Sequence, residues 1–419
     1  MSETTASVSA APTKKMPSIL GGAMIIAGTA VGAGMFALPV YSAGMWFSVS
    51  MALLLFCCFC AYTTSLYMIE AGQHYPEGAS FTTIAADTLG PLGKLFATGC
   101  VAFVSFILCY AYISGGSSIV AQVAADMGMN LSHSSAAVLF AVVFATLVIA
   151  GSRVVDKVSV IMLGGMVLTF FGSTSMLTVS ADADKLFPAL PFSDSLSYLW
   201  VAIPLLVTSF GVHSTVPSLA KHYNKDMQRV RLAVLLGMLL TLLVYVVWQL
   251  AIMGNVGREQ FSAIIAEGGN VATLISAVGQ STDVTGVESA LMVFGNLALA
   301  SSFIGVALGL QDLVKDFFKL GDSLKHSLVA GVITFLPPAI GGALAPNGFI
   351  TAIGYAALAA VVFVLILPPM MARVLRQRGQ QGQFQVAGGM ARLNLVFGFG
   401  VLALVAETLH LLGLLPQFG

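Results

Sequence analysis

Charged residues are scarce in this sequence. Only 9% of its 419 residues are Asp, Glu, Lys or Arg, whereas a soluble domain carries about 25%. The 18 basic and 18 acidic residues cancel to a formal net charge of zero, which argues against a nucleic-acid partner. Hydrophobic residues make up 58% of the chain. This balance excludes an ordinary soluble domain and predicts a polytopic protein that sits in the lipid bilayer.

Motifs of enzymes and of nucleotide-binding proteins are missing too. There is no His-Glu-x-x-His pattern, no catalytic carboxylate pair and no phosphate-binding loop, so we expect no enzyme, no cofactor and no use of ATP. Gly32-x-Gly34-x-x-Ala37 resembles a dinucleotide fingerprint, but no strand precedes it. The cysteines lie in apolar segments without metal-ligand spacing, which predicts core packing and no metal site: Cys57, Cys58, Cys60, Cys100 and Cys109.

Long apolar runs predict an all-α fold with about eleven transmembrane helices. A polar cytoplasmic tail, residues 1–17, precedes a first half, 18–180, a second half, 198–373, and a last helix, 393–415. The predicted spans are 18–44, 46–71, 93–121, 135–151, 158–180, 198–220, 230–254, 288–315, 326–345, 348–373 and 393–415.

Basic residues predict the orientation of these spans. With the N-terminus in the cytoplasm, the inside segments hold 16 of the 18 lysines and arginines, and only Lys185 and Arg258 fall outside. Loops rich in Lys and Arg stay on the cytoplasmic side. The asymmetry therefore supports the orientation and the number of spans, and it predicts that residues 415–419 lie outside.

Two spans are interrupted near mid-depth by glycine and polar residues. They carry Gly28-Thr29-Ala30-Val31-Gly32-Ala33-Gly34-Met35 and Thr208-Ser209-Phe210-Gly211-Val212-His213-Ser214-Thr215, and Pro39 and Pro217 follow them. Unwound backbone at membrane depth is tolerated only where it is buried in protein or lines a cavity. Small residues can also serve helix packing. Because the two halves begin with these breaks and enter from opposite sides, we predict an inverted repeat with a transporter site between them.

Several motifs resemble the bacterial permeases for hydroxy and aromatic amino acids. They are Ala27-Gly28-Thr29-x-x-Gly32-Ala33-Gly34-Met35-Phe36-x-Leu38-Pro39, Ser209-Phe210-Gly211-x-His213-x-x-Val216-Pro217-Ser218-Leu219, Asn296-Leu297-Ala298-x-Ala300-Ser301-Ser302-Phe303, and Pro346-Asn347-Gly348-Phe349. Met253-Gly254-Asn255-Val256 is most similar to the tryptophan permeases, with the tyrosine permeases next. The resemblance implies five-plus-five inverted repeats with an eleventh helix, the bacterial inner membrane, and import of tryptophan or another aromatic amino acid by proton symport.

The sequence departs from this family at two positions. Gln311 stands where an aromatic residue is expected, and the fifth span lacks the lysine expected near Met166. A titrating lysine there could take the place of a sodium ion, so its absence bears on the coupling ion.

The breaks predict how an amino acid zwitterion is held. Free N–H groups of the outer half-helix near Ala33, Gly34 and Met35 can bind the carboxylate. Free carbonyls near Ala27 and Gly28, and those of Ser209 and Phe210, can take the ammonium group. The candidate substrate-binding residues are therefore Ala27, Gly28, Thr29, Gly32, Ala33, Gly34, Met35, Ser209, Phe210, Gly211 and His213.

An aromatic substrate also needs a flat apolar slot. We expect Phe210 as a wall and Tyr110 or Tyr112 as a second, because two tyrosines two apart on a helix face different ways. Each of these aromatic residues can instead serve packing.

The last candidate pair, Glu407 and His410, lies one turn apart in the last span and can form an ion pair.

The coupling ion has two sets of candidates. His213 is a buried ionisable group at membrane depth and so a candidate proton carrier, or else a neutral histidine that shapes the break. Ser301 and Ser302, with carbonyls of the first break, could form an oxygen cage for sodium, or bond to their own helix. Glu70 and Asp312 fit solvated interfacial charges, or a gate in the case of Asp312.

Three functional classes compete for this chain. A channel would need a continuous polar pore, whereas the polar groups here cluster at two breaks. An enzyme would need a catalytic constellation, which the sequence does not offer. A secondary transporter explains the paired breaks and the inverted halves.

The predicted topology can be tested with reporter fusions. We expect a reporter after Gly419 to lie outside and one inserted in the 377–385 loop to lie in the cytoplasm, because one predicted span, 393–415, separates the two sites. The measurement is the activity of a side-specific reporter such as alkaline phosphatase. Two reporters on the same side would mean that the span count is wrong.

Overall fold

The computed structural model describes residues 17–77, 79–282, 284–321, 323–345, 348–380 and 382–419. Within these ranges the chain forms helices and turns and no strand. The predicted all-α fold is therefore confirmed. The tail up to residue 16 and the Pro346-Asn347 pair lie outside the described residues, as do the side chains of Ala33, Ser152, Arg153 and Asp156.

The first half of the chain forms the helices up to α6. They are α1 (Ile19–Ala30), the 3₁₀ turn η1 (Ala33–Phe36), α2 (Ala37–Ser42), α3 (Trp46–Gly72), α4 (Phe81–Asp126), α5 (His133–Ile149) and α6 (Ser152–Val179). Two short helices, α7 (Ala183–Leu186) and α8 (Phe192–Ser197), connect this half to the next.

The second half and the last helix follow. They comprise α9 (Leu199–Thr208), α10 (Thr215–His222), α11 (Met227–Met253), α12 (Gln260–Ala266), α13 (Val271–Ser281), α14 (Val287–Phe318), α15 (Leu324–Leu344), α16 (Phe349–Val361), the π-helical turn η2 (Val362–Ile366), α17 (Leu367–Gln377) and α18 (Gly389–Leu411).

Not every predicted span is a full-length membrane helix. Eight described stretches are long and apolar enough to cross a membrane, and the bent pair of α1 and α2 would make a ninth. α5 has 17 residues, and α9 has 10. The chain is therefore a polytopic membrane protein, while the number eleven stays a prediction.

Prolines mark where the two broken helices resume. Pro39 is the third residue of α2, and Pro217 is the third residue of α10. Proline is tolerated in a first turn because the N–H groups there have no partner within the helix. Both sequence breaks thus coincide with real interruptions of a helix.

α4 is longer than the predicted span 93–121. It starts at Phe81 and bends at Gly90, whose φ of 72° lies in the left-handed region that favours glycine. Pro91 follows and cannot donate a helical hydrogen bond. The residues before this bend form an additional helical segment, which Ser80 begins by accepting a hydrogen bond from the Thr83 N–H at 3.2 Å.

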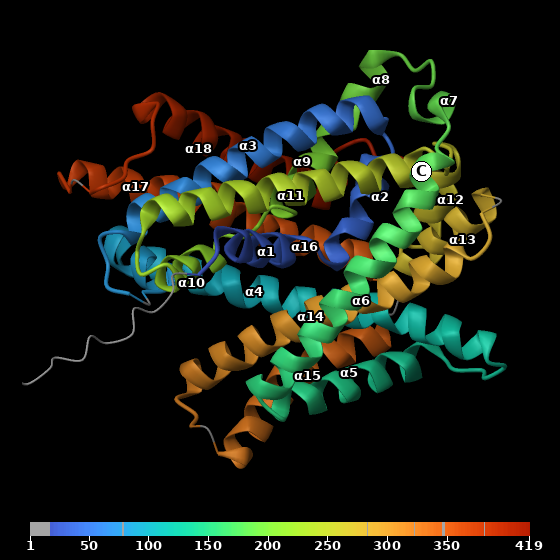
Figure 1. Cartoon of the computed structure of the whole chain (residues 1–419), viewed down its shortest axis with the longest axis horizontal. Coiled ribbons are helices and arrows are strands. Elements are labelled where there is room, and N and C mark those ends of the chain that lie inside the picture. Colours follow the sequence, from blue (N-terminus) through green and yellow to red (C-terminus); the bar gives the residue numbers. More distant parts are fainter. Residues whose placement is uncertain (1–16, 78, 283, 322, 346–347, 381) are drawn as a thin grey trace, which may run out of the picture.

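α3 and α11 run roughly along the long axis of the view, whereas α6 crosses it steeply (Figure 1). α1 begins at the left-hand end of this view, and the C-terminus lies at the right-hand end. α7 and α12 lie at the right-hand end as well. Lys185 belongs to α7, and Arg258 lies two residues before α12. The two cations predicted to be outside therefore share one end of the bundle with the C-terminus.

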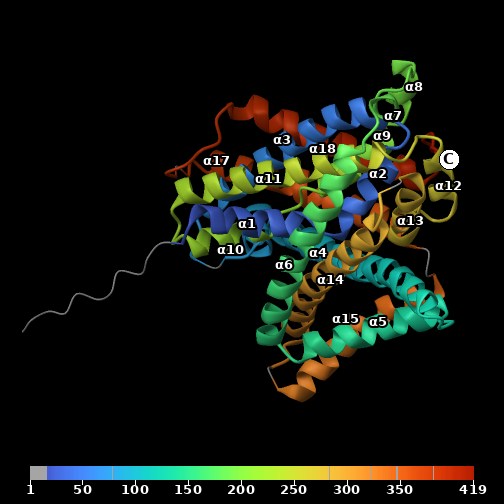
Figure 2. The ribbon, with the colours of Figure 1, turned by 45° about the vertical axis from the view of Figure 1, so that its right-hand side comes forward.

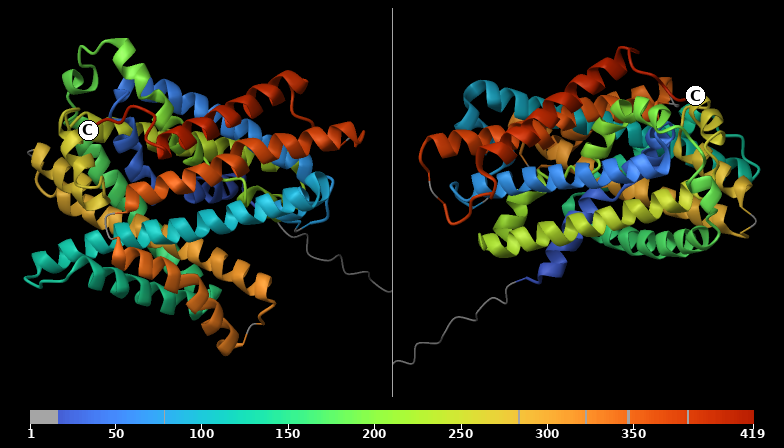
Figure 3. Two further views of the ribbon diagram at one scale, coloured as in Figure 1. Left: turned by 180° about the vertical axis from the view of Figure 1, so that it is seen from behind. Right: turned by 90° about the horizontal axis from the view of Figure 1, so that it is seen from above.

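The packing partners of the two halves correspond to each other. α1 packs on α11 just as α9 and α10 pack on α3, and α4 packs on α16 and α17 just as α14 packs on α6. α5 packs on α15, and this pair stands apart from the helices around α1 and α3 (Figures 2 and 3). Exchanging the halves exchanges these contacts, as expected for a repeat, while the inversion of the two halves stays a prediction.

Candidate functional site

The first helix break lies between α1 and η1. Val31 and Gly32 have extended backbones, with φ/ψ angles of −77°/110° and −165°/−157°, and the two half-helices are bent by 59°. The Val31 N–H donates to the Ala27 carbonyl at 2.7 Å. This contact corrects the expectation that the Ala27 carbonyl is free for a ligand, because the helix continues to Ala30.

The second break, residues 209–214, is a series of tight turns. The Gly211 N–H donates to the Thr208 carbonyl at 2.9 Å, and the Val212 N–H donates to the Phe210 carbonyl at 2.9 Å. A Cβ atom on Gly211 would lie 2.8 Å from the Thr208 carbonyl oxygen. Real Cβ atoms do not approach a backbone oxygen so closely, so only glycine fits this turn.

Tyr245 of α11 joins the two breaks. Its hydroxyl lies 2.7 Å from the Ala30 carbonyl and 2.8 Å from the Ser209 carbonyl, and the side chain is 1% exposed. A hydroxyl has one proton to donate, so the two carbonyls share it. Sequence reasoning missed Tyr245, and its only signal was a phenol within a long apolar helix.

A third contact near the breaks comes from α14. A Cβ atom on Gly32 would overlap the Ser302 hydroxyl, so α14 approaches the backbone of the first break closely. The Tyr112 hydroxyl of α4 is hydrogen-bonded to Ser302. Four helices, α1, α4, α11 and α14, therefore converge on the first break.

Open space borders the first break at Gly28 of α1 and at Gly34 of η1. No heavy atom lies within 4 Å of a Cβ atom placed on Gly28 or on Gly34. Met24 and Ile25 of α1 are 42% and 45% exposed, whereas the first four residues of α2 are all buried. The half-helix α1 thus has an open face, whereas the half-helix α2 is enclosed.

Aromatic rings enclose the first break on the side of α2. The Phe36 ring centroid lies 5.2 Å from that of Trp248 and 5.5 Å from that of Phe294. Met35, expected to contact the substrate, is fully buried, as is Phe210. The Phe210 ring packs on Tyr245 with centroids 5.4 Å apart, so in this arrangement it supports Tyr245 and does not line open space.

Tyr112, and not Tyr110, faces the first break. The Tyr110 hydroxyl donates to the Ala345 carbonyl at 3.0 Å, and its ring lies 3.0 Å from a Cβ atom placed on Gly341 of α15. Tyr110 is therefore turned away from the breaks, and Tyr112 faces Ser302 beside the first break. Residues two apart on a helix point in nearly opposite directions, which accounts for the correction.

His213 points away from the first break. Its Nε2 atom lies 2.7 Å from the Thr64 hydroxyl and 3.4 Å from the Ser65 hydroxyl, both on α3. The side chain is fully buried, and its ring faces Phe363 of η2 at 6.4 Å. These contacts fit the alternative in which a hydrogen-bonded histidine shapes the second break.

The two serines of α14 differ in their contacts. The Ser301 hydroxyl donates to the Ala298 carbonyl of its own helix at 3.2 Å. Ser302, as described above, meets Gly32 and Tyr112. Thr29 of α1 lies 3.4 Å from Thr215 of α10 through their hydroxyl oxygens, which adds a direct contact between the two broken helices.

Glu70 is not the solvated interfacial charge that the sequence suggested. Its side chain is 5% exposed and forms a two-pronged ion pair with Arg376 of α17, at 2.6 and 2.8 Å. The Val386 N–H also donates to Glu70, at 2.8 Å. This buried pair links α3 to α17 and to the loop before α18.

Gln311 of α14 lies one residue before Asp312. Its side-chain amide donates to the Ser327 carbonyl of α15 at 3.0 Å.

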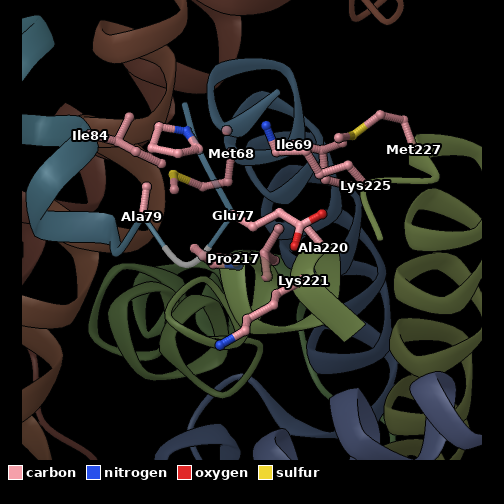
Figure 4. Close-up of a pocket in the computed structure, with 13 residues that line it drawn as sticks. Met68, Ile69, Glu77, Ala79, Ile84, Pro217, Ala220, Lys221, Lys225 and Met227 are labelled. Carbon is pink, nitrogen blue, oxygen red and sulfur yellow. The ribbon is translucent and has the colours of Figure 1, made fainter. Parts of the chain in front are cut away.

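Two cavities lie away from the breaks. Figure 4 shows Glu77, Lys221 and Lys225 around a small cavity between α3, α10 and the start of α4. Its volume of about 20 Å³ has room for about one water molecule. A larger cavity of about 370 Å³ lies at the end that carries the C-terminus, between α2, α16 and α18. The small cavity is therefore not a site for an amino acid.

Comparisons with known proteins agree with this architecture. The sequence model of the tryptophan/tyrosine permease family matches residues 15–407. A tryptophan-specific transport protein of Pseudomonas aeruginosa (strain UCBPP-PA14) is 42% identical over 411 residues, which cover 96% of this chain and 97% of that protein. A low affinity tryptophan permease of Escherichia coli O157:H7 is 35% identical, with 97% and 99% covered. A tyrosine permease of Enterobacter agglomerans is 33% identical, with the same shares covered.

The role of Tyr245 can be tested with a matched pair of variants. Tyr245→Phe leaves two carbonyls without their shared donor, which costs about 1–2 kcal/mol, so we expect the uptake efficiency to fall about tenfold. Tyr110→Phe removes a hydroxyl from the same residue type away from the breaks, and we expect uptake within about twofold of wild type. The measurement is initial uptake rate normalised to the amount of protein in the membrane. A larger loss in Tyr110→Phe than in Tyr245→Phe would contradict the assignment.

Proposed function

Since the chain belongs to the tryptophan/tyrosine permease family, we propose that it imports tryptophan across a bacterial inner membrane by symport with protons. Members of this family are transport permeases and not enzymes. The observation that carries the proposal is the pair of helix breaks that Tyr245 joins beside open space. Such paired breaks are where secondary transporters hold their substrates.

Main-chain groups of the breaks would recognise the zwitterion. The outer half-helix presents N–H groups near Gly34, where a carboxylate is favoured by the helix dipole. The carbonyls of Ala30 and Ser209 converge within hydrogen-bond distance of one hydroxyl, and an ammonium group has three protons to donate. The substrate would therefore supply the donors that Tyr245 alone cannot supply to both carbonyls.

The aromatic side chain would lie beside Tyr112. This residue is 7% exposed and close to Gly32 through Ser302. Tryptophan is favoured over tyrosine because the relatives named for tryptophan are up to 42% identical, whereas the relative named tyrosine permease is 33% identical. Transport of tyrosine or of several aromatic amino acids is the alternative.

Protons are favoured over sodium as the coupling ion. Ser301 directs its hydroxyl proton to its own helix, and Ser302 is engaged with Tyr112, so an oxygen cage would require these bonds to rearrange. His213 is a buried ionisable side chain that could carry a proton. Sodium symport through Ser301 and Ser302 is the second candidate, because the fifth helix has no lysine near Met166.

The proposed orientation places α1 and α17 toward the cytoplasm. The bias of 16 of the 18 lysines and arginines toward one side supports a cytoplasmic N-terminus and an outside C-terminus. In that orientation the open face of α1 is toward the cytoplasm, and the enclosed α2 is toward the outside. The arrangement described here would then be the one that is open to the cytoplasm.

Transport into sealed membrane vesicles tests the coupling ion and the substrate. We expect labelled tryptophan to accumulate under a pH gradient without sodium, and not under a sodium gradient at equal pH, because the proton supplies the driving force. Excess unlabelled tryptophan should suppress this signal more strongly than excess tyrosine. Accumulation under the sodium gradient alone would overturn the proton assignment and direct attention to Ser301 and Ser302.

A further inference from the structure

The last helix brings a buried carboxylate and a histidine to the outer half of the first broken helix. Glu407 of α18 is 1% exposed, and its Oε2 atom lies 3.6 Å from Nδ1 of His410. Its other oxygen, Oε1, has no hydrogen-bond partner among the described residues. A buried carboxylate with an unused oxygen is costly at membrane depth and marks a functional position.

Tyr41 of α2 belongs to the same cluster. Its ring faces that of His410 with centroids 6.0 Å apart, and its hydroxyl donates to the Ile350 carbonyl at 3.2 Å. A Cβ atom on Gly354 would lie 3.0 Å from the Tyr41 hydroxyl and 3.3 Å from Glu407 Oε1. Tyr41 and Glu407 therefore meet at the same glycine of α16, where a side chain would have to displace one of them.

The larger cavity, of about 370 Å³, gives this cluster a route to solvent. Tyr41, His410 and Gly354 line it, and Glu407 lies behind them. Phe418, near the C-terminus, forms part of the wall and lies between the Tyr198 ring, at 5.7 Å, and the Arg258 guanidinium, at 4.4 Å. The cavity thus opens at the end of the bundle that carries the C-terminus.

We propose that Glu407 and His410 together bind the transported proton as it arrives from the outside. The resulting change in charge alters the contact between His410 and Tyr41, and through Tyr41 it acts on α2. This inference rests on the proposed proton symport. Without the proton, the pair is a carboxylate beside a neutral imidazole and carries one net negative charge. With it, the pair is neutral, either as carboxylate and imidazolium or as carboxylic acid and imidazole. The proton comes from the outer solution through the cavity.

Neutralising the pair changes the contacts that hold α2. At 3.6 Å the carboxylate and the imidazole are just beyond hydrogen-bond distance. An added proton creates a charge-assisted bond between them, which is shorter and stronger. His410 would then move relative to the Tyr41 ring that it faces, and Tyr41 is part of the outer half-helix that must move for the outer side to open.

Few other ionisable groups face this pair. Tyr41 of α2 and Tyr355 of α16 line the same cavity, with Tyr198 across from them. α9 and η2 also pack against α18, and neither contains a titratable residue. α3 and α17 pack on α18 as well, and Cys60 of α3 lies near Arg392 at the start of α18. The proposal therefore assigns the proton to Glu407 and His410.

Two transport assays, proton-driven accumulation and substrate exchange, distinguish a proton-binding role of Glu407 from a structural role. For one proton per substrate, a gradient of one pH unit supports about tenfold accumulation in wild type. We expect Glu407→Gln to accumulate no labelled tryptophan above equilibrium and to lose its dependence on outside pH, while exchange stays within about twofold. Glu407→Asp should keep both activities, and Glu259→Gln, on the exposed N-terminal side of α12, serves as a carboxylate control.

Each outcome of this experiment decides between the alternatives. Wild-type protein without pH-driven accumulation would overturn proton symport and this proton site with it. If the wild-type protein accumulates substrate under the pH gradient and Glu407→Gln accumulates it normally, the proton site alone is overturned. If Glu407→Gln also loses exchange, His410→Gln decides between the two roles. Loss of accumulation with retained exchange in His410→Gln supports the proton site. Loss of exchange in Glu407→Gln, His410→Gln and Glu407→Asp shows that the pair has a structural role only.

Discussion

The structure depends on how the backbone groups freed by two broken helices are satisfied. In a membrane, each unpaired N–H or C=O costs several kcal/mol, so a helix breaks only where other groups replace its bonds. Here a single hydroxyl, that of Tyr245, lies within 2.8 Å of one carbonyl from each break. Glycine at 32 and at 211 allows α14 and the local turn to approach the unwound chain closely. The close approach of α11 and α14 to the unwound chain meets this requirement.

The two half-helices of the first break are in different surroundings: one has an open face, and the other is enclosed. α2 is enclosed by aromatic rings around Phe36 and by the cluster of Tyr41, His410 and Glu407. α1 keeps an open face at Gly28. At the end of the bundle opposite the C-terminus, the ion pair of Glu70 and Arg376 connects α3 to α17. Movement that frees α2 while α1 closes would exchange the open and the enclosed side, as alternating access requires.

Sequence patterns predicted the family, the all-α membrane fold and both breaks, because apolar length, glycine and proline act locally. They did not predict Tyr245, since its hydroxyl meets a carbonyl 215 residues away. Nor could they choose between Tyr110 and Tyr112. Helix geometry shows that two residues two apart point in different directions, but it does not show which one faces the site. The pairing of Glu70 with Arg376, 306 residues apart, and the turn of His213 toward Thr64 also arise only from tertiary packing.

The central claim is that the breaks recognise both charged ends of the amino acid through main-chain groups. Titration calorimetry of the purified protein tests it most directly, with tryptophan, tryptamine, which lacks the carboxylate, and indole-3-propionate, which lacks the ammonium group. Losing a hydrogen-bonded charged group costs about 3 kcal/mol, so the account predicts that each analogue binds about a hundredfold more weakly than tryptophan. Binding of either analogue within about threefold of tryptophan would contradict recognition by the breaks.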